Sequence, residues 1–309
     1  MTGWCSWYAF GTHINEKHIL DHTRLIARTG LPLDVILIDD GWQSHWGDWT
    51  SPDPNKFPRG MKRVAATIAA HKRIPGIWIA PFLVHPEARI AMQHPEWLVA
   101  SHTGTFVEGG KITALDHFTP WRRWILDLSL QGVQTYLKKC FKTIIEDWRF
   151  RYIKLDFLYA QHFHPAYPDN SRPDVLLHEF LLSIKKRYPD VYLSASGCPL
   201  EPAMGAVDAM RISDDIVNPQ LRNLWPINRI VHSARLRQLK DNLAVRGQTH
   251  RFWHIDPDVF VTHPSYGFTP AQVRELRALI IQANGLRFLG DNLLELDQET
   301  IQRVIMPLY

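Results

Sequence analysis

Aspartates follow three short apolar segments of this sequence, and their spacing suits acid–base and nucleophilic chemistry. Asp39 and Asp40 follow the segment VILI, Asp156 ends the segment YIKLD, and Asp214 and Asp215 follow the segment AMRIS. Two carboxyl groups on separate elements can divide a reaction, one attacking carbon and the other donating a proton. In retaining glycoside hydrolysis two such groups lie about 5–5.5 Å apart. The pattern therefore indicates a hydrolase of glycosidic bonds if these segments converge.

The segment that carries Asp156 also presents a lysine. Residues two apart in a strand point to the same side, so Lys154 and Asp156 are expected to project together. A neighbouring ammonium favours the ionised carboxylate, and an ionised carboxylate at a strand end is a candidate nucleophile. The alternative for this pair is a structural salt bridge.

The same parity selects one of the two adjacent aspartates after AMRIS. Arg211, Ser213 and Asp215 fall on one side of an extended segment, and Asp214 falls on the other. Negative neighbours favour the protonated carboxyl that a general acid requires, so Asp215 is the candidate acid/base. A cap in a loop is the alternative interpretation of this residue.

Two further sites bear polar groups near a strand end. Adjacent carboxylates are costly to bury unless they are hydrogen-bonded. We interpret Asp39 and Asp40 as acceptors for neighbouring sugar hydroxyls, with Trp42 as a wall, and a helix cap or solvated loop is the alternative. Cys198, after Gly197, would need a histidine base to act as a nucleophile, and we favour a buried inert thiol.

These residues need elements that bring strand ends together. Short apolar runs alternate with amphipathic runs, as in parallel strands covered by helices. Eight such strands predict a single (β/α)8 barrel with catalytic groups at the C-terminal strand ends. A doubly wound open sheet competes, but the first strand lacks the Gly-x-Gly-x-x-Gly turn of dinucleotide sites. The predicted strands are Gly3–Phe10, Asp34–Trp42, Ile74–Phe82, Tyr152–Leu158, Val191–Cys198, Ala209–Ser213, Phe252–Ile255 and Leu286–Leu289.

Apolar residues at helical spacing predict the intervening helices, among them 133–148 and a last helix at Gln298–Met306. Gly30 and Gly285 stand where C-terminal caps belong. Thr269 and the proline after it read as a cap and a first turn.

Composition narrows the class of protein. The chain has 309 residues, of which 45% are hydrophobic and 21% charged, as in ordinary globular proteins. The net charge is 35 − 31 = +4, without the dense basic cluster of a nucleic-acid groove. No run of about 18 apolar residues predicts a membrane span. Three distant cysteines argue against a disulfide framework, and the absence of a signal-peptide pattern leads us to expect a cytoplasmic protein.

Ten short motifs occur in order along the chain, each weak alone. They are Trp4-Cys5-Ser6-Trp7, Asp39-Asp40-Gly41-Trp42, Lys56-Phe57-Pro58-x-Gly60-Met61-Lys62, Gly76-Ile77-Trp78-Ile79-Ala80-Pro81-Phe82, His94-Pro95-x-Trp97, Leu126-Asp127-Leu128-Ser129, Lys154-x-Asp156, Gly197-Cys198-Pro199, Arg211-x-x-x-Asp215 and Asp256-Pro257-Asp258. Together they resemble the catalytic barrel of glycoside hydrolase clan D, chiefly family 36, which contains α-galactosidases and raffinose-family synthases.

The resemblance implies roles for the matching positions. Asp156 matches the nucleophile and Asp215 the acid/base, in agreement with the parity argument. Asp39 and Asp40 match the pair that binds the 4- and 6-hydroxyls of the galactosyl ring. No metal or organic cofactor is implied. The other positions expected to line or wall the same subsite are Trp4, Trp42, Trp78, Lys154, Cys198 and Arg211.

The resemblance also has departures. Family members usually carry a β-sandwich before the barrel and a smaller β-domain after it, whereas residues 1–309 are expected to form the barrel alone. A barrel-only member, a partial gene product, a homo-oligomer and a subunit whose partner supplies the β-domains are the alternatives. Ile255 stands where many relatives carry asparagine.

The expected function is retaining hydrolysis of terminal α-galactosides through a covalent glycosyl-enzyme. One alternative is transfer of galactose to a sugar acceptor, as in raffinose synthases, and another is a non-catalytic or partial barrel that binds carbohydrate. A third is a metal-dependent hydrolase in which His162 and His164 supply ligands. The glycone stays open between galactose and N-acetylgalactosamine.

Overall fold

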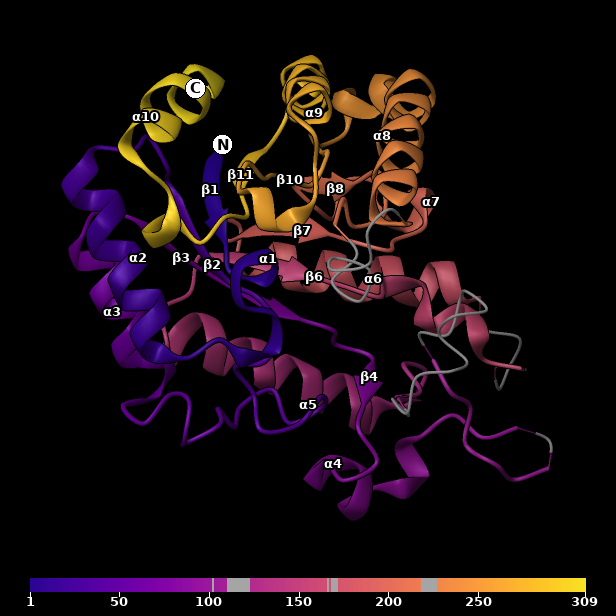
Figure 1. Cartoon of the computed structure of the whole chain (residues 1–309). Coiled ribbons are helices and arrows are strands. Elements are labelled where there is room, and N and C mark those ends of the chain that lie inside the picture. Colours follow the sequence, from indigo (N-terminus) through magenta and orange to yellow (C-terminus); the bar gives the residue numbers. More distant parts are fainter. Residues whose placement is uncertain (102, 110–122, 166, 168–171, 218–226) are drawn as a thin grey trace.

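Parallel strands form a ring that helices surround in this computed structural model (Figure 1). The structure describes the whole chain except residues 102, 110–122, 166, 168–171 and 218–226. In the described part, no helix combines the length and the apolar character that crossing a bilayer would need. The ring of parallel strands with helices around it confirms the predicted (β/α)8 barrel fold class.

The strands run in the order β10-β11-β1-β2-β3-β6-β7-β8-β9 and all pair in parallel. They are β1 (Thr2–Cys5), β2 (Val35–Ile38), β3 (Ile74–Ile79), β6 (Tyr152–Leu155), β7 (Tyr192–Ala195), β8 (Ala209–Arg211), β9 (His254–Asp256), β10 (Val259–Phe260) and β11 (Arg287–Leu289). A separate antiparallel pair joins β4 (Leu83–Val84) to β5 (Trp124–Ile125).

The ring closes through a single stretch of chain. β9 pairs with β8, and β10, two residues later, pairs with β11. The backbone N–H of Leu286 also donates to the carbonyl of Ile255 at 2.8 Å. β9 and β10 thus share one barrel position, which makes eight positions in all.

Helices connect the strands and bury their apolar faces against them. Strand β2 is buried at all four residues, as expected for a strand between the barrel interior and a helix layer. The helices are α1 (Trp7–Phe10), α2 (Glu16–Thr29), α3 (Gly60–Ala70), α4 (Arg89–Gln93), α5 (Gln131–Lys142), α6 (Pro173–Arg187), α7 (Leu200–Ala203), α8 (Ile227–Arg246), α9 (Pro270–Ala283) and α10 (Gln298–Thr300).

All eight predicted strand positions are confirmed, although most strands are shorter than predicted. The first prediction is wrong beyond Cys5, because the chain turns into helix α1 there. The cause lies at Ser6, whose backbone N–H still donates to the carbonyl of Leu37 while its hydroxyl oxygen accepts from the backbone N–H of Asp39 at 2.9 Å. This bond ties the end of β1 to the end of β2.

The predicted helix ends are confirmed in two cases of three. Gly30 caps α2 in the left-handed conformation, and Thr269 forms a capping box at the start of α9. Gly285 is not the cap of α9, because Asn284 takes the left-handed position at φ 46°. Gly285 instead lies against the backbone of Ile255.

The close approach at Gly285 predicts a stability effect. A Cβ added there would lie 2.0 Å from the carbonyl oxygen of Ile255, at the point where the ring closes. We expect Gly285→Ala to lower the free energy of unfolding by about 3 kcal/mol, measured by urea denaturation. Gly247→Ala is the control, because nothing lies within 4 Å of its added Cβ. Equal stability of the two variants would contradict this account of closure.

Candidate active site at the barrel mouth

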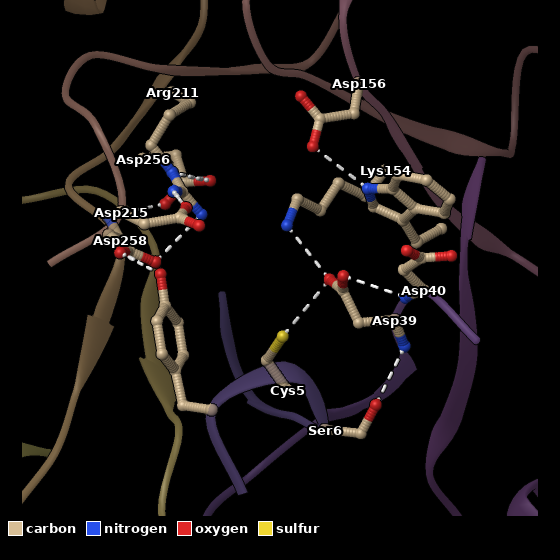
Figure 2. Close-up of polar contacts among 12 residues, drawn as sticks. Cys5, Ser6, Asp39, Asp40, Lys154, Asp156, Arg211, Asp215, Asp256 and Asp258 are labelled. Carbon is tan, nitrogen blue, oxygen red and sulfur yellow. Dashed lines mark hydrogen bonds and ion pairs between the residues drawn. The ribbon is translucent and has the colours of Figure 1, made fainter. Parts of the chain in front are cut away.

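Two groups of charged side chains face each other where the strands end (Figure 2). One group comes from β2 and β6 and includes Asp39, Lys154 and the neighbouring Asp156. The other surrounds Arg211 at the end of β8 and includes Asp215. The barrel therefore brings the carboxylates after three predicted strands to a single mouth, as the sequence predicts.

Asp39 is the centre of the first group. Its Oδ2 accepts from Nζ of Lys154 at 2.9 Å and from the thiol of Cys5 at 3.4 Å. Burial acts to lower the pKa of Lys154, yet the charge of Asp39 raises it, and the pKa stays above the ordinary lysine value. Burial and the charge of Asp39 raise the pKa of Cys5, so the thiol remains a donor. These contacts fix the position of the Asp39 carboxyl group.

The partner of Lys154 differs from the sequence prediction. The alternation rule places Lys154 and Asp156 on one side, but the ammonium forms its ion pair with Asp39 instead. A lysine side chain is long enough to reach past β3, which lies between β6 and β2. The charge of Asp156 still acts to raise the pKa of Lys154, so the two groups lie near each other as predicted, although the ion pair of Lys154 is with Asp39.

Asp156 is held by neutral donors. Its Oδ2 accepts from the indole N–H of Trp78 at 3.0 Å, and its Oδ1 accepts from the backbone N–H of Phe157 at 2.8 Å. Phe157 adopts a left-handed conformation at φ 54°, which turns the chain at the end of β6. Hydrogen bonds to a carboxylate favour its ionised form and fix its direction. Trp78, predicted as a wall, thus also orients Asp156.

Asp40 points into an aromatic environment. Its Oδ1 accepts from the side-chain amide of Gln43 at 2.6 Å and from the indole of Trp46 at 2.9 Å. Only 4% of the residue is exposed, and burial raises its pKa to about 6. The guanidinium of Arg123 lies 3.9 Å from the Trp46 ring centroid, so a cation covers the other side of this indole.

One guanidinium joins three carboxylates in the second group. Arg211 places Nε 3.1 Å from Asp256, Nη2 2.9 Å from Asp258 and Nη1 3.3 Å from Asp215. Burial acts to lower the pKa of Arg211, but the charges of Asp256 and Asp258 raise it above its ordinary value. The three partners come from two neighbouring barrel positions, so Arg211 links the end of β8 to the β9–β10 stretch.

The parity prediction for the adjacent aspartates is confirmed. Asp215 points to Arg211, and its side chain stays 47% exposed at the mouth. Asp214 points the other way and pairs with Arg235 of α8. The two carboxylates are thus separated as predicted, although β8 ends at Arg211 and the backbone bends at Ser213 and Asp214.

Two of the predicted tryptophan walls are wrong. Trp4 is fully buried, stacks on His22 of α2 with ring centroids 4.3 Å apart, and donates to the carbonyl of Asp291. Trp42 is also fully buried and packs against Trp148 near the end of α5. Both indoles fill the layer between strands and helices. Hydrophobic spacing alone does not separate such packing from a site wall.

Sequence reasoning misses three residues that contact the predicted ones, and a fourth, Tyr8, that contacts one of these three. Asp256 and Asp258 were part of a motif without a role, and their position after the seventh predicted strand is the signal that could have found them. Tyr8 was assigned to a strand. Trp46 lies four residues beyond Trp42, and no spacing rule distinguishes the two indoles. The four are Tyr8, Trp46, Asp256 and Asp258.

Cys198 fits the inert thiol rather than the nucleophile. Burial raises the pKa of its thiol to about 12, and Asp174 adds to the effect although Arg246 opposes it. A protonated thiol is a poor nucleophile. A contact between Cys198 and a sugar ring stays a prediction.

The histidines of the metal hypothesis do not converge. His162 lies 2.9 Å from Asp174 of α6, whereas His164 lies 3.3 Å from Asp127. The two rings thus have different carboxylate partners. This arrangement contradicts a shared ligand pair.

Another group, at His45, His85 and Glu87, has ligand atoms within 4.8 Å of one another. The backbone N–H of Glu87 donates to Nδ1 of His85 at 3.1 Å. A neutral ring with Nδ1 as acceptor carries its proton on Nε2, the nitrogen that a cation would need. This contact disfavours metal binding by His85.

Comparison with known proteins finds relatives for much of the chain. The family model described as melibiase matches residues 4–198. The α-galactosidase C of Emericella nidulans is 28% identical over 211 residues, which cover 60% of this chain and 25% of that protein. The chain thus spans about a quarter of the length of this curated relative.

Solved structures extend the similarity to the whole barrel. The α-galactosidase from Thermus thermophilus, in complex with p-nitrophenyl α-D-galactopyranoside, has a TM-score of 0.80 and 26% identity, and the match covers 99% of this chain and 61% of that one. The GH36 α-galactosidase AgaA from Geobacillus stearothermophilus has a TM-score of 0.71 over 100% of this chain and 41% of its own. Its 15% identity supports the fold alone.

The buried Asp40 predicts a pH-dependent stability. Its pKa of about 6 exceeds the ordinary aspartate value of 3.8, so the folded chain binds this proton more tightly than the unfolded chain. Between pH 4 and 7 the wild type should therefore lose about 2 kcal/mol of stability relative to Asp40→Asn as the pH rises. Urea denaturation across this range measures the difference.

The control for this experiment is Asp241→Asn, which removes an exposed carboxylate from α8. Its stability should follow the wild-type pH dependence. Parallel curves for the wild type and Asp40→Asn would contradict the account of Asp40.

Proposed function

The chain belongs to the melibiase family, and we propose that its barrel, residues 1–309, hydrolyses terminal α-galactosides with retention of configuration. The observation that carries the proposal is the placement of Asp156 and Asp215 on opposing sides of one mouth, each with its own set of donors (Figure 2). The relatives described as α-galactosidases, one of them bound to an α-galactoside, support galactose as the glycone.

In the first step Asp156 is the nucleophile. Its carboxylate attacks the anomeric carbon while Asp215 gives its proton to the glycosidic oxygen, and the bond between that carbon and oxygen breaks. The N–H groups of Trp78 and Phe157 hold the carboxylate in one direction. Fixed donors of this kind cost no reorganisation when the reaction begins.

In the second step Asp215 is the base. Its carboxylate takes a proton from water, the water oxygen attacks the anomeric carbon, and the ester to Asp156 breaks. The exposed side chain of Asp215 suits both steps, because it must reach the leaving group and then a water molecule. Two inversions leave the sugar with its original configuration.

The sugar itself would be held by the first group. Asp39 accepts from Lys154, Cys5 and the backbone N–H of Asp40, and since a carboxylate has about four acceptor positions, about one is left for a ring hydroxyl. Asp40 lies against Trp46 and would accept from a neighbouring hydroxyl. Arg211 and Cys198 are proposed to line the same subsite.

Removal of either carboxyl should lower kcat/KM, and the dependence of the loss on the leaving group should differ between the two variants. We expect Asp156→Ala to lose at least about 10³-fold in kcat/KM on every α-galactoside. Asp215→Ala should lose about 10²–10⁴-fold on raffinose and far less on p-nitrophenyl α-galactoside, whose leaving group needs little protonation. Steady-state kinetics with both substrates measures these effects.

The matched control is Asp214→Ala, whose carboxylate pairs with Arg235 on α8. It should keep nearly wild-type rates. Equal rates in the wild type, Asp156→Ala and Asp215→Ala would overturn the assignment of the site.

The configuration of the first product tests retention. Nuclear magnetic resonance during early turnover should show α-galactose before it equilibrates with the β-anomer. The β-anomer as first product would contradict a covalent intermediate.

Sucrose added to the same reaction separates hydrolysis from transfer, since galactosyl-sucrose in place of free galactose would identify a transglycosylase.

A further inference from the structure

Asp258 lies beneath the candidate acid/base. Its side chain is fully buried, and its backbone adopts the left-handed conformation at φ 78° directly after Pro257. Its N–H donates to Oδ1 of Asp256 at 2.9 Å, which fixes the turn between β9 and β10. A non-glycine residue in this conformation is strained and persists only where surrounding contacts hold it.

The carboxylate of Asp258 holds Asp215 from two directions. Its Oδ1 pairs with Nη2 of Arg211, whose Nη1 contacts Asp215. Its Oδ2 accepts at 2.7 Å from the backbone N–H of Ile216, the residue that follows Asp215. One side chain thus anchors both the charged partner of Asp215 and the backbone beside it.

Tyr8 supports Asp258 from the opposite side of the ring closure. Its hydroxyl donates to Oδ2 of Asp258 at 2.5 Å, and Tyr8 belongs to α1, directly after the first strand. Burial raises the pKa of Tyr8, so the hydroxyl keeps its proton. The bond connects α1 to the β9–β10 stretch and to the loop of Asp215.

We propose that Asp258 is a positioning residue for the acid/base Asp215, that it shares the charge of Arg211 so that Asp215 can take up a proton, and that Tyr8 holds Asp258 in place. This inference rests on the proposed function. Arg211 lies 2.9 Å from Asp258 and 3.1 Å from Asp256, closer than its 3.3 Å to Asp215. A guanidinium with Asp215 as its main partner would instead hold that carboxyl ionised.

The charged groups packed around Asp258 all influence its protonation. Arg211 comes from β8, Asp256 from β9 and Asp215 from the loop after β8, and Tyr8 contributes a neutral donor from α1. Burial raises the pKa of Asp258 to about 6, the charge of Arg211 lowers it, and the charge of Asp215 raises it. The charge of Asp215 therefore opposes the ionisation of Asp258.

The test compares two substrates in Asp258→Asn and Tyr8→Phe. In Asp258→Asn we expect kcat/KM for raffinose to fall about 10–100-fold and that for p-nitrophenyl α-galactoside to fall less than about 3-fold, because only the first leaving group needs full protonation. The alkaline limb of the pH profile for raffinose should move to lower pH, since a negative charge that opposes ionisation of Asp215 is gone. In Tyr8→Phe we expect the same preference of effect, with kcat/KM for raffinose falling several-fold and that for p-nitrophenyl α-galactoside falling less.

The matched control is Asp208→Asn. Asp208 precedes β8 at the other end of the barrel, where it pairs with Lys185 of α6. Its variant should keep the wild-type ratio between the two substrates and the wild-type pH profile, whatever its effect on stability. Tyr8→Phe removes a single oxygen, so it keeps the test available if Asp258→Asn does not fold.

Equal losses on both substrates with an unchanged pH profile in folded Asp258→Asn and Tyr8→Phe would overturn the proposal and leave a structural role alone. Wild-type protein that turns over neither substrate would count against the proposed function instead.

Azide gives a second readout, because it attacks the glycosyl-enzyme in place of water and needs no activation by a base. We expect azide to raise kcat for p-nitrophenyl α-galactoside in Asp258→Asn but not in Asp208→Asn.

Discussion

The barrel mouth depends on two buried cations that neutralise converging carboxylates. Lys154 pairs with Asp39 on one side, and Arg211 joins Asp215, Asp256 and Asp258 on the other. Burial of an unpaired ion costs several kcal/mol, so aspartates gathered at strand ends need such partners. The eight barrel positions supply the geometry, because they bring the ends of β2, β6, β8 and β9 to one place. Closure of the ring brings the carboxylates together, and the two cations neutralise them, so each depends on the other.

Much of the fold and part of the site follow from sequence because they depend on local backbone rules. Alternating runs predict the barrel, and strand parity separates Asp214 from Asp215 correctly. Parity does not predict the ion-pair partner of Lys154, since the long side chain reaches Asp39 on another strand. Tyr8 and Asp258 are 250 residues apart in sequence, so only the closed ring reveals their contact. Buried indoles such as Trp4 look like site walls until their neighbours are known.

The two sides of the mouth differ in a way that suits two chemical roles. Asp156 accepts from neutral N–H groups of Trp78 and Phe157, which fix the direction of an attacking carboxylate. Asp215 is half-exposed and has only a share of the Arg211 charge, which suits a group that must gain and lose a proton. Environments that push two carboxyls toward opposite protonation states are the general basis of such divided catalysis. The match to 61% of the Thermus thermophilus α-galactosidase chain covers 99% of this chain, so the matched part includes both Asp156 and Asp215.

The most direct test of the account is to identify the carboxyl that bonds to the sugar. A fluorinated galactosyl fluoride forms a glycosyl-enzyme that hydrolyses slowly, and peptide mapping by mass spectrometry locates the attachment. The account predicts one galactosyl group per chain, attached to Asp156 and absent from Asp156→Ala. Turnover of α-galactosides with the label on another carboxylate, or with no label at all, would contradict it.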